Sequence, residues 1–283
     1  MTRSSPSRTS LGVAALRAAH QMLDAEPRIL DDTVVLRVLD PRGLDHLRAA
    51  PERLQSPEAR ALRAHVVVRS RYAEDRLAEA AARGVRQYVS LGAGLDTFAY
   101  RQPGWASALR IFEVDRPETQ GDKRERLARA GVAVPANVVF VPIDFECETI
   151  PDVLRAHGFD AAAPAFVSWL GVMMYLTREA ADAVFGFVRG LPAGSEIVFT
   201  FSPSPELGTR ATADGPSLQD RVAQVGEPMR THIAPEALVA HLSGLGFSDV
   251  TLLTPDEIEV RYTGGRTDGL HPSRWTTIAS ARV

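Results

Sequence analysis

The sequence lacks the features that mark several protein classes. It holds one cysteine, Cys147, among 283 residues, so it can form no internal disulfide. That usage fits a reducing compartment, and we expect a cytoplasmic protein. No apolar run approaches the roughly 18–20 residues that a membrane-spanning helix needs. The first ten residues lack the apolar core and the cleavage pattern of a secretory signal.

Positive charge and clustered histidines are scarce as well. Lysine and arginine number 32 against 35 aspartate and glutamate residues, so no overall positive field favours a nucleic-acid backbone. The seven histidines form no H-x-x-x-H pair and no pair with the cysteine, so we expect no metal site. We therefore expect a small molecule as the partner, while the composition leaves the oligomeric state open.

What the sequence does contain is an alternation of apolar strands and helices. Runs rich in β-branched and aromatic residues predict strands at 85–92, 109–115, 137–145, 165–175 and 195–201, and two more within 251–262 and 275–283. Helices are predicted at 11–23, 58–83, 118–130, 149–157, 178–189 and 235–245. Near-continuous apolar strands separated by helices are typical of an α/β fold with a parallel sheet covered on both faces.

The domain organisation follows from the same pattern. We expect a single domain over 1–283, in which helices of residues 1–84 cover the site and residues 85–201 form the cofactor-binding core. The Pro-, Gly- and Ser-rich segment 202–234 is an excursion that caps the substrate, and residues 235–283 supply the last helix and strands.

The stretch SLGAGLDTFAYR, residues 90–101, carries the main functional signal. Gly92 and Gly94 follow the first strand of the core and remove the side chains that would block a ligand. Asp115 ends the second strand, 21 residues after Gly94, where an acid can accept both hydroxyls of a ribose. The next helix should begin near Asp96 and Thr97. Thr97 also replaces the third glycine of the dinucleotide fingerprint, which favours an adenosine ligand without a pyrophosphate, such as S-adenosylmethionine.

Three further residues suit that cofactor. Asp144 ends the third strand and can accept from an adenine amino group, while Phe145 can pack on the ring. Arg69, on the helix before the first strand, can bind the carboxylate of a methionine moiety with two parallel hydrogen bonds. Purely structural roles remain open at this point: a turn for the two glycines, a helix cap for Asp115 or Asp144, and a surface salt bridge for an arginine.

Several longer stretches resemble a known family. RSRYAED, GVRQYVSLGAGLDTFAYR, IFEVDRPETQGDKRERL and FVSWLGVMMYLT are similar to the leucine carboxyl methyltransferase-like family, and in particular to its bacterial branch of S-adenosylmethionine-dependent methyltransferases. The resemblance runs from about Leu11 to the C-terminus and includes GEPMRTHIAPEAL and RYTGGRTDGL. It implies a class I methyltransferase fold, with a Rossmann-like seven-stranded sheet whose last strand is antiparallel, and N-terminal helices that form a lid.

The resemblance also assigns roles to the cofactor residues. Arg69 would hold the cofactor carboxylate, Gly92 would line its methionine, Asp115 would bind the ribose, and Asp144 with Phe145 would bind the adenine. We place Ala93, Gly94, Asp96 and Glu113 in the same cofactor-binding set. Leu170 stands where family members often carry a glutamate that contacts the cofactor, so that contact is lost or comes from the backbone.

The acceptor is expected to bind in loops beyond the strand ends. Tyr175 follows the fourth strand and is expected to contact substrate, with a catalytic role for Tyr175 and His232. Arg230, Tyr262 and Arg266 are further substrate candidates, although each could equally be a turn residue or part of a rim ion pair. If Arg230 or Arg266 faces the pocket, the acceptor is anionic.

These observations predict an S-adenosylmethionine-dependent methyltransferase that leaves S-adenosylhomocysteine as product and acts on a carboxylate or hydroxyl of a small molecule. Two alternatives stay open: a non-catalytic domain that binds the same nucleosides, and a nicotinamide-dependent oxidoreductase. The missing third glycine argues against the second alternative.

Overall fold

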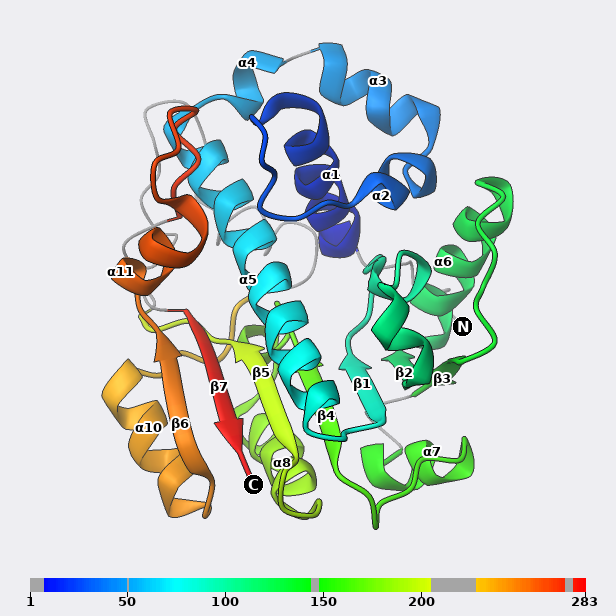
Figure 1. Cartoon of the computed structure of the whole chain (residues 1–283), viewed down its shortest axis with the longest axis vertical. Coiled ribbons are helices and arrows are strands. Elements are labelled where there is room, and N and C mark those ends of the chain that lie inside the picture. Colours follow the sequence, from blue (N-terminus) through cyan, green and yellow to red (C-terminus); the bar gives the residue numbers. More distant parts are fainter. Residues whose placement is uncertain (1–7, 50, 144–147, 205–227, 273–276) are drawn as a thin grey trace.

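One seven-stranded sheet organises the chain (Figure 1). The computed structural model describes residues 8–49, 51–143, 148–204, 228–272 and 277–283. The strands are β1 (Gln87–Leu91), β2 (Arg110–Asp115), β3 (Val138–Pro142), β4 (Ala165–Trp169), β5 (Glu196–Thr200), β6 (Ser248–Leu253) and β7 (Ile278–Arg282). Their order is β3-β2-β1-β4-β5-β7-β6, and only β7 runs antiparallel to its neighbours. The predicted sheet with an antiparallel last strand is confirmed.

Helices cover both faces of the sheet and its carboxyl edge. They are α1 (Arg8–Leu23), α2 (Thr33–Val38), α3 (Pro41–Ala49), α4 (Pro51–Leu54), α5 (Pro57–Ala82), α6 (Pro117–Arg129), α7 (Ile150–Ala156), α8 (Arg178–Arg189), α10 (Pro235–Gly244) and α11 (Pro255–Ile258). In Figure 1 α5 crosses the front of the sheet, α8 lies behind it, and α1 to α4 lie above the carboxyl ends of the parallel strands.

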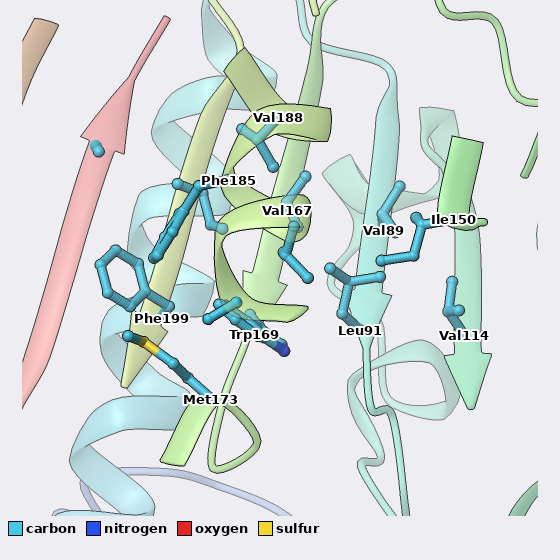
Figure 2. Packing of buried hydrophobic residues seen from close by; sticks show 14 of the residues in the cluster. Val89, Leu91, Val114, Ile150, Val167, Trp169, Met173, Phe185, Val188 and Phe199 are labelled. Carbon is cyan, nitrogen blue, oxygen red and sulfur yellow. The ribbon is translucent and has the colours of Figure 1, made fainter. Parts of the chain in front are cut away.

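Each face of the sheet has its own apolar core. On one face, side chains from α7, α8 and α10 pack on the strands, and Figure 2 shows Phe185 of α8 lying against Trp169 and Phe199. On the other face α5 supplies Val67, Tyr72 and further apolar side chains. Every residue of β1, β4 and β5 is buried, because a sheet covered on both faces leaves no strand position exposed to water.

The strand order also determines where a ligand can bind. The chain leaves β1 toward β2 on one side and later returns to β4 on the other side. Loops that follow β1 and β4 therefore diverge, and a crevice forms beyond the carboxyl ends of these two strands. The N-terminal helices α1 and α2 pack over this edge, around a third apolar cluster that includes Leu95 of the glycine loop.

A local strand prediction is wrong. Residues 255–262 are helical rather than part of a strand, because Thr254 and Glu257 form a capping box and Pro255 occupies the first helical turn. The helix predicted to begin near Asp96 and Thr97 is the short 3₁₀ helix η1 (Phe98–Tyr100), which a second one, η2 (Gly104–Ala108), follows. Thr97 is the N-cap residue of η1, and Asp96 accepts a hydrogen bond from the Phe98 N–H at 2.9 Å.

None of the helices in the described ranges combines the length and the apolar character that crossing a membrane requires.

Candidate functional site

The glycine loop and the acid of β2 are in direct contact. Both Gly92 and Gly94 have positive φ, at 67° and 46°, a conformation that glycine adopts without strain. Asp115 Oδ2 accepts a hydrogen bond from the Gly94 N–H at 2.6 Å, and its Oδ1 accepts one from the Arg116 N–H at 2.8 Å. Burial raises the pKa of Asp115, and the two backbone hydrogen bonds oppose that shift. The carboxylate therefore faces the bend, as the spacing of the two motifs predicts.

Neighbouring side chains lie close to this bend. A Cβ placed on Gly92 would overlap the side chain of Val172, and one on Gly94 would lie 3.1 Å from Cβ of Ser10 in α1. Ala93 between them is buried. Glycine at these positions therefore allows the loop after β4 and the helix α1 to approach the backbone closely.

The other two predicted acids of this region are held by basic side chains. Glu113 lies 2.8 Å from Lys123 Nζ and accepts a hydrogen bond from the Tyr100 hydroxyl at 2.8 Å. Burial raises the pKa of Glu113, while Lys123 and Tyr100 lower it. Asp96 lies 3.6 Å from Arg17 Nη1. Both carboxylates are thus paired with basic side chains of the protein.

Arg69 has the most unusual environment of the predicted site residues. Its exposed fraction is 8%, and within the part of the chain that the structure describes its guanidinium has no hydrogen-bond or salt-bridge partner. Burial lowers its pKa to about 10, with Tyr175 and Asp96 opposing the shift and the charge of Arg17 adding to it. An unpaired charge of this kind is costly to bury, which indicates a position kept ready for an anion.

Gly171 allows Arg69 to occupy this position. Gly171 has φ of 74°, and a Cβ there would lie 2.9 Å from two nitrogens of the Arg69 guanidinium. Its N–H donates to Thr200 Oγ1 at 2.7 Å, which fixes the loop after β4 against β5. Leu170 is partly buried and packs against the apolar cluster under α5.

Tyr175 and the segment before α10 lie together at the same edge. Tyr175 ends the 3₁₀ helix η3 (Met173–Tyr175) that follows β4. The Arg230 N–H donates to the Met174 carbonyl at 2.7 Å, and Thr231 Oγ1 donates to the Leu176 carbonyl at 2.6 Å. His232 follows, with Nδ1 2.9 Å from Ser202 Oγ. A cavity of about 350 Å³ is lined by Arg230 and His232 together with the start of α8.

Tyr262 and Arg266 lie elsewhere. The Tyr262 hydroxyl donates to Asp75 of α5 at 3.0 Å, and both residues line a separate cavity. Arg266 pairs with Asp268 and donates to the carbonyl oxygens of Pro27 and Ala25 at 2.7 and 2.8 Å. The structure therefore does not bring these two residues together with Tyr175.

Asp144 and Phe145, predicted to bind adenine, and Cys147 lie outside the described residues. Within the described ranges, the structure groups no three His, Cys, Asp or Glu side chains in a way that could hold a metal ion.

Sequence reasoning missed two residues at this edge, Arg17 and Gly171. Arg17 lies on the same buried stripe of α1 as Ala14 and Ala18. An arginine on such a stripe of alanines is the sequence signal that indicates a buried polar role. Gly171 lies in the turn after β4 and has positive φ, which is typical of a position that needs glycine.

The residues present fit S-adenosylmethionine. Its methionine carboxylate is the kind of group that the unpaired Arg69 guanidinium can bind through two hydrogen bonds. Asp115 offers carboxylate lone pairs beside the glycine loop, as a ribose requires.

Comparison with known proteins agrees with this site. The leucine carboxyl methyltransferase family model matches residues 10–189, which is more than half of the chain. YktD of Bacillus subtilis (strain 168), provisionally named an S-adenosyl-L-methionine-dependent methyltransferase, is 31% identical over 292 residues, covering 95% of each chain.

Two solved structures share the fold. A DUF574 family protein from Streptomyces avermitilis MA-4680 matches with a TM-score of 0.55 at 19% identity over 96% of each chain. A protein of Thermobifida fusca YX, described as a methyltransferase, matches with a TM-score of 0.55 at 17% identity over 99% of this chain and 96% of its own. The family match together with the glycine loop and its acid leads to one conclusion: the chain belongs to the leucine carboxyl methyltransferase family and is an S-adenosylmethionine-dependent methyltransferase.

Proposed function

We propose that this methyltransferase transfers the methyl group to an oxygen atom of an anionic small molecule, and that it does so in the cytoplasm. The observation that carries the acceptor side of the proposal is the attachment of residues 230–232 to the loop after β4. We infer that this attachment holds the Arg230 guanidinium and the His232 imidazole near the edge where Arg69 and Tyr175 lie. The single cysteine supports the reducing compartment.

The cofactor side rests on Arg69, the loop Gly92–Gly94 and Asp115. Arg69 would bind the carboxylate of the cofactor, since its guanidinium has no other anion among the described residues. Asp115 would accept from the ribose while it continues to hold the Gly94 N–H. Asp144 and Phe145 remain our prediction for the adenine.

Methyl transfer requires little acid–base catalysis from the protein. When bound, S-adenosylmethionine supplies an electrophilic methyl group on a sulfonium centre. A carboxylate acceptor is already ionised at neutral pH and needs no base, whereas a hydroxyl acceptor benefits from one. His232 is suited to that second case, because its Nδ1 contacts Ser202 Oγ and its Nε2 is left for the acceptor.

Arg230 supports an anionic acceptor. The described residues give its guanidinium no hydrogen-bond or salt-bridge partner, whereas Arg178, in the same cavity, is paired with Asp182 at 3.2 Å. The residues that we propose for the acceptor site are therefore Tyr175, Arg230 and His232. Tyr262 and Arg266 are left out because they bond to Asp75 and to the Pro27 carbonyl.

The test uses methyl-labelled S-adenosylmethionine and a panel of small carboxylates, phenols and amines. Labelled product from a carboxylate that loses the label in mild base identifies an ester, and base-stable product from a phenol identifies an ether. Label found only in amines would refute oxygen as the acceptor atom.

Two variants then test the acceptor site. Arg230→Met should raise the KM of the anionic acceptor about tenfold, the worth of a hydrogen bond to a charged group. Arg178→Met serves as the matched control and should leave that KM within about twofold of wild type. An unchanged KM in Arg230→Met would remove Arg230 from the acceptor site.

A further inference from the structure

The helix α1 lies directly on the glycine loop, and Arg17 donates hydrogen bonds to it. Arg17 Nη2 donates to the Leu95 carbonyl, and Nη1 donates to Thr97 Oγ1 at 3.3 Å. About two turns of helix toward the N-terminus, Ser10 packs against Gly94. The geometry of residues 94–97 therefore depends on where α1 lies.

The charge of Arg17 ties three chain segments together. Its exposed fraction is 2%, and its Nη1 lies 3.2 Å from Asp32 and 3.6 Å from Asp96. Asp32 caps α2 by accepting from the Val35 N–H at 3.1 Å. A buried ion pair of this kind contributes little net stability but is costly to break on one side, so it holds α1, α2 and the glycine loop in one arrangement.

Arg17 also acts on Arg69. The two guanidinium groups are close enough for the charge of Arg17 to lower the pKa of Arg69. Arg17 has carboxylate partners, whereas Arg69 has none among the described residues. An anion placed against Arg69 would relieve the repulsion between the two, so Arg17 makes the edge more favourable for an anionic group.

We propose that Arg17 is a positioning residue for the cofactor: it clamps α1 across the glycine loop, so that cofactor affinity and the closed position of the N-terminal helices are coupled. This inference rests on the proposed placement of the cofactor at Arg69 and Gly92–Gly94. It adds that an N-terminal helix, outside the core that binds the cofactor, contributes to affinity through one side chain.

A purely structural role makes a different prediction, and Arg63 provides the matched control. Arg63 is buried to the same degree, with an exposed fraction of 1%, and also ties the α1 region to α5. Its Nε and Nη2 each lie 2.7 Å from Asp24, and its Nη1 donates to the Leu54 carbonyl at 2.6 Å. None of these contacts involves the glycine loop, so replacing Arg63 should cost stability alone.

The experiment measures the Kd of S-adenosylhomocysteine by calorimetry for wild type, Arg17→Met and Arg63→Met, at a temperature where circular dichroism shows all three folded. Arg17→Met should raise Kd about tenfold or more, within the usual range of coupling between two sites. Arg63→Met should stay within about twofold, and Arg17→Lys should recover part of the affinity. If either methionine variant fails to fold, Arg17→Lys and Arg63→Lys provide the same contrast.

Hydrogen exchange gives the second readout. In wild type, S-adenosylhomocysteine should slow amide exchange in both the glycine loop and α1, whereas in Arg17→Met it should slow exchange in the loop only. Equal Kd values for folded Arg17→Met and wild type would overturn the inference, and so would equal losses in the Arg17 and Arg63 variants. Absence of binding to wild type would instead contradict the cofactor site itself.

Discussion

Two regions of the molecule are rich in arginine, and they differ in how the arginines are paired. The first, the outer cavity, has a volume of about 750 Å³ beside α5 and is lined by residues within 25–29, 71–79 and 261–268. The second is the carboxyl edge, where Arg17 lies beside the glycine loop and Arg69 lies beside Gly171.

In the outer cavity the arginines are engaged by the protein. Arg71 lies 2.8 Å from Asp75, and Arg76 lies 2.6 Å from the buried Glu196. Arg266 bonds the Ala25 and Pro27 carbonyls. At the carboxyl edge Arg69 has no such partner in the described chain. The lack of a partner for Arg69 and the order of the strands therefore both favour the carboxyl edge as the proposed cofactor site.

The strongest test of this comparison replaces Arg69. Arg69→Met should weaken S-adenosylhomocysteine binding by about 1.5–3 kcal/mol, because a charged hydrogen-bond partner of the carboxylate is lost. The same change should leave the free energy of unfolding unchanged or raise it, because no ion pair within the protein is broken. Calorimetry and chemical denaturation measure the two quantities.

Arg76→Met is the counterpart in the outer cavity. It should leave the affinity unchanged and lower the free energy of unfolding by about 1.5–3 kcal/mol, since Glu196 loses one charged hydrogen bond while it keeps Arg83 at 2.7 Å. The opposite pattern, with Arg76 affecting binding and Arg69 affecting stability, would reverse the assignment of the two regions.

A smaller effect is expected from Gly171. Gly171→Ala should weaken S-adenosylhomocysteine binding about tenfold, because the new Cβ displaces the guanidinium of Arg69, the flexible end of a long side chain. It should also cost about 1 kcal/mol of stability from the positive φ. Gly265→Ala is the matched control in the outer cavity, because Gly265 has φ of 75° and no atom within 4 Å of the added Cβ. Equal affinities in both variants would show that Arg69 need not lie against Gly171.

The sequence predicted the fold well where burial decides structure. The strand predicted at 195–201 was found as β5 (Glu196–Thr200), because a strand buried on both faces is rich in apolar and β-branched residues. The prediction for 165–175 ran past β4, since the apolar residues after Trp169 continue through a turn at Gly171 into η3. In 255–262 a local capping box outweighed the apolar pattern.

The site was predictable only where two motifs sit at fixed places in the fold. Gly94 lies in the loop after β1 and Asp115 ends the adjacent parallel strand β2, so their contact follows from the pairing of these strands. Arg17 could not be placed in the same way, because its role depends on how α1 packs on a loop almost eighty residues later in the chain. Arg266 lies in a glycine-rich loop with charged residues, a pattern found in pocket walls and also in loops that hold two chain segments together. In the structure it holds two segments together, because it donates to the Pro27 carbonyl.

The smallest effect is expected from the ion pair between Arg266 and Asp268, and it is tested by changing the pH. Burial opposes ionisation of Asp268, but hydrogen bonds from Arg266 and from the Ala25 and Leu270 N–H groups outweigh it and hold its pKa well below the ordinary value. An acid with a lowered folded-state pKa contributes stability above its unfolded pKa, and loses it as pH falls toward the folded pKa. The melting temperature of wild type should therefore fall below about pH 4. In Asp268→Asn this fall in melting temperature should be smaller. The variant should bind S-adenosylhomocysteine at neutral pH as wild type does, and a loss of affinity there would show that the outer cavity and the carboxyl edge are coupled.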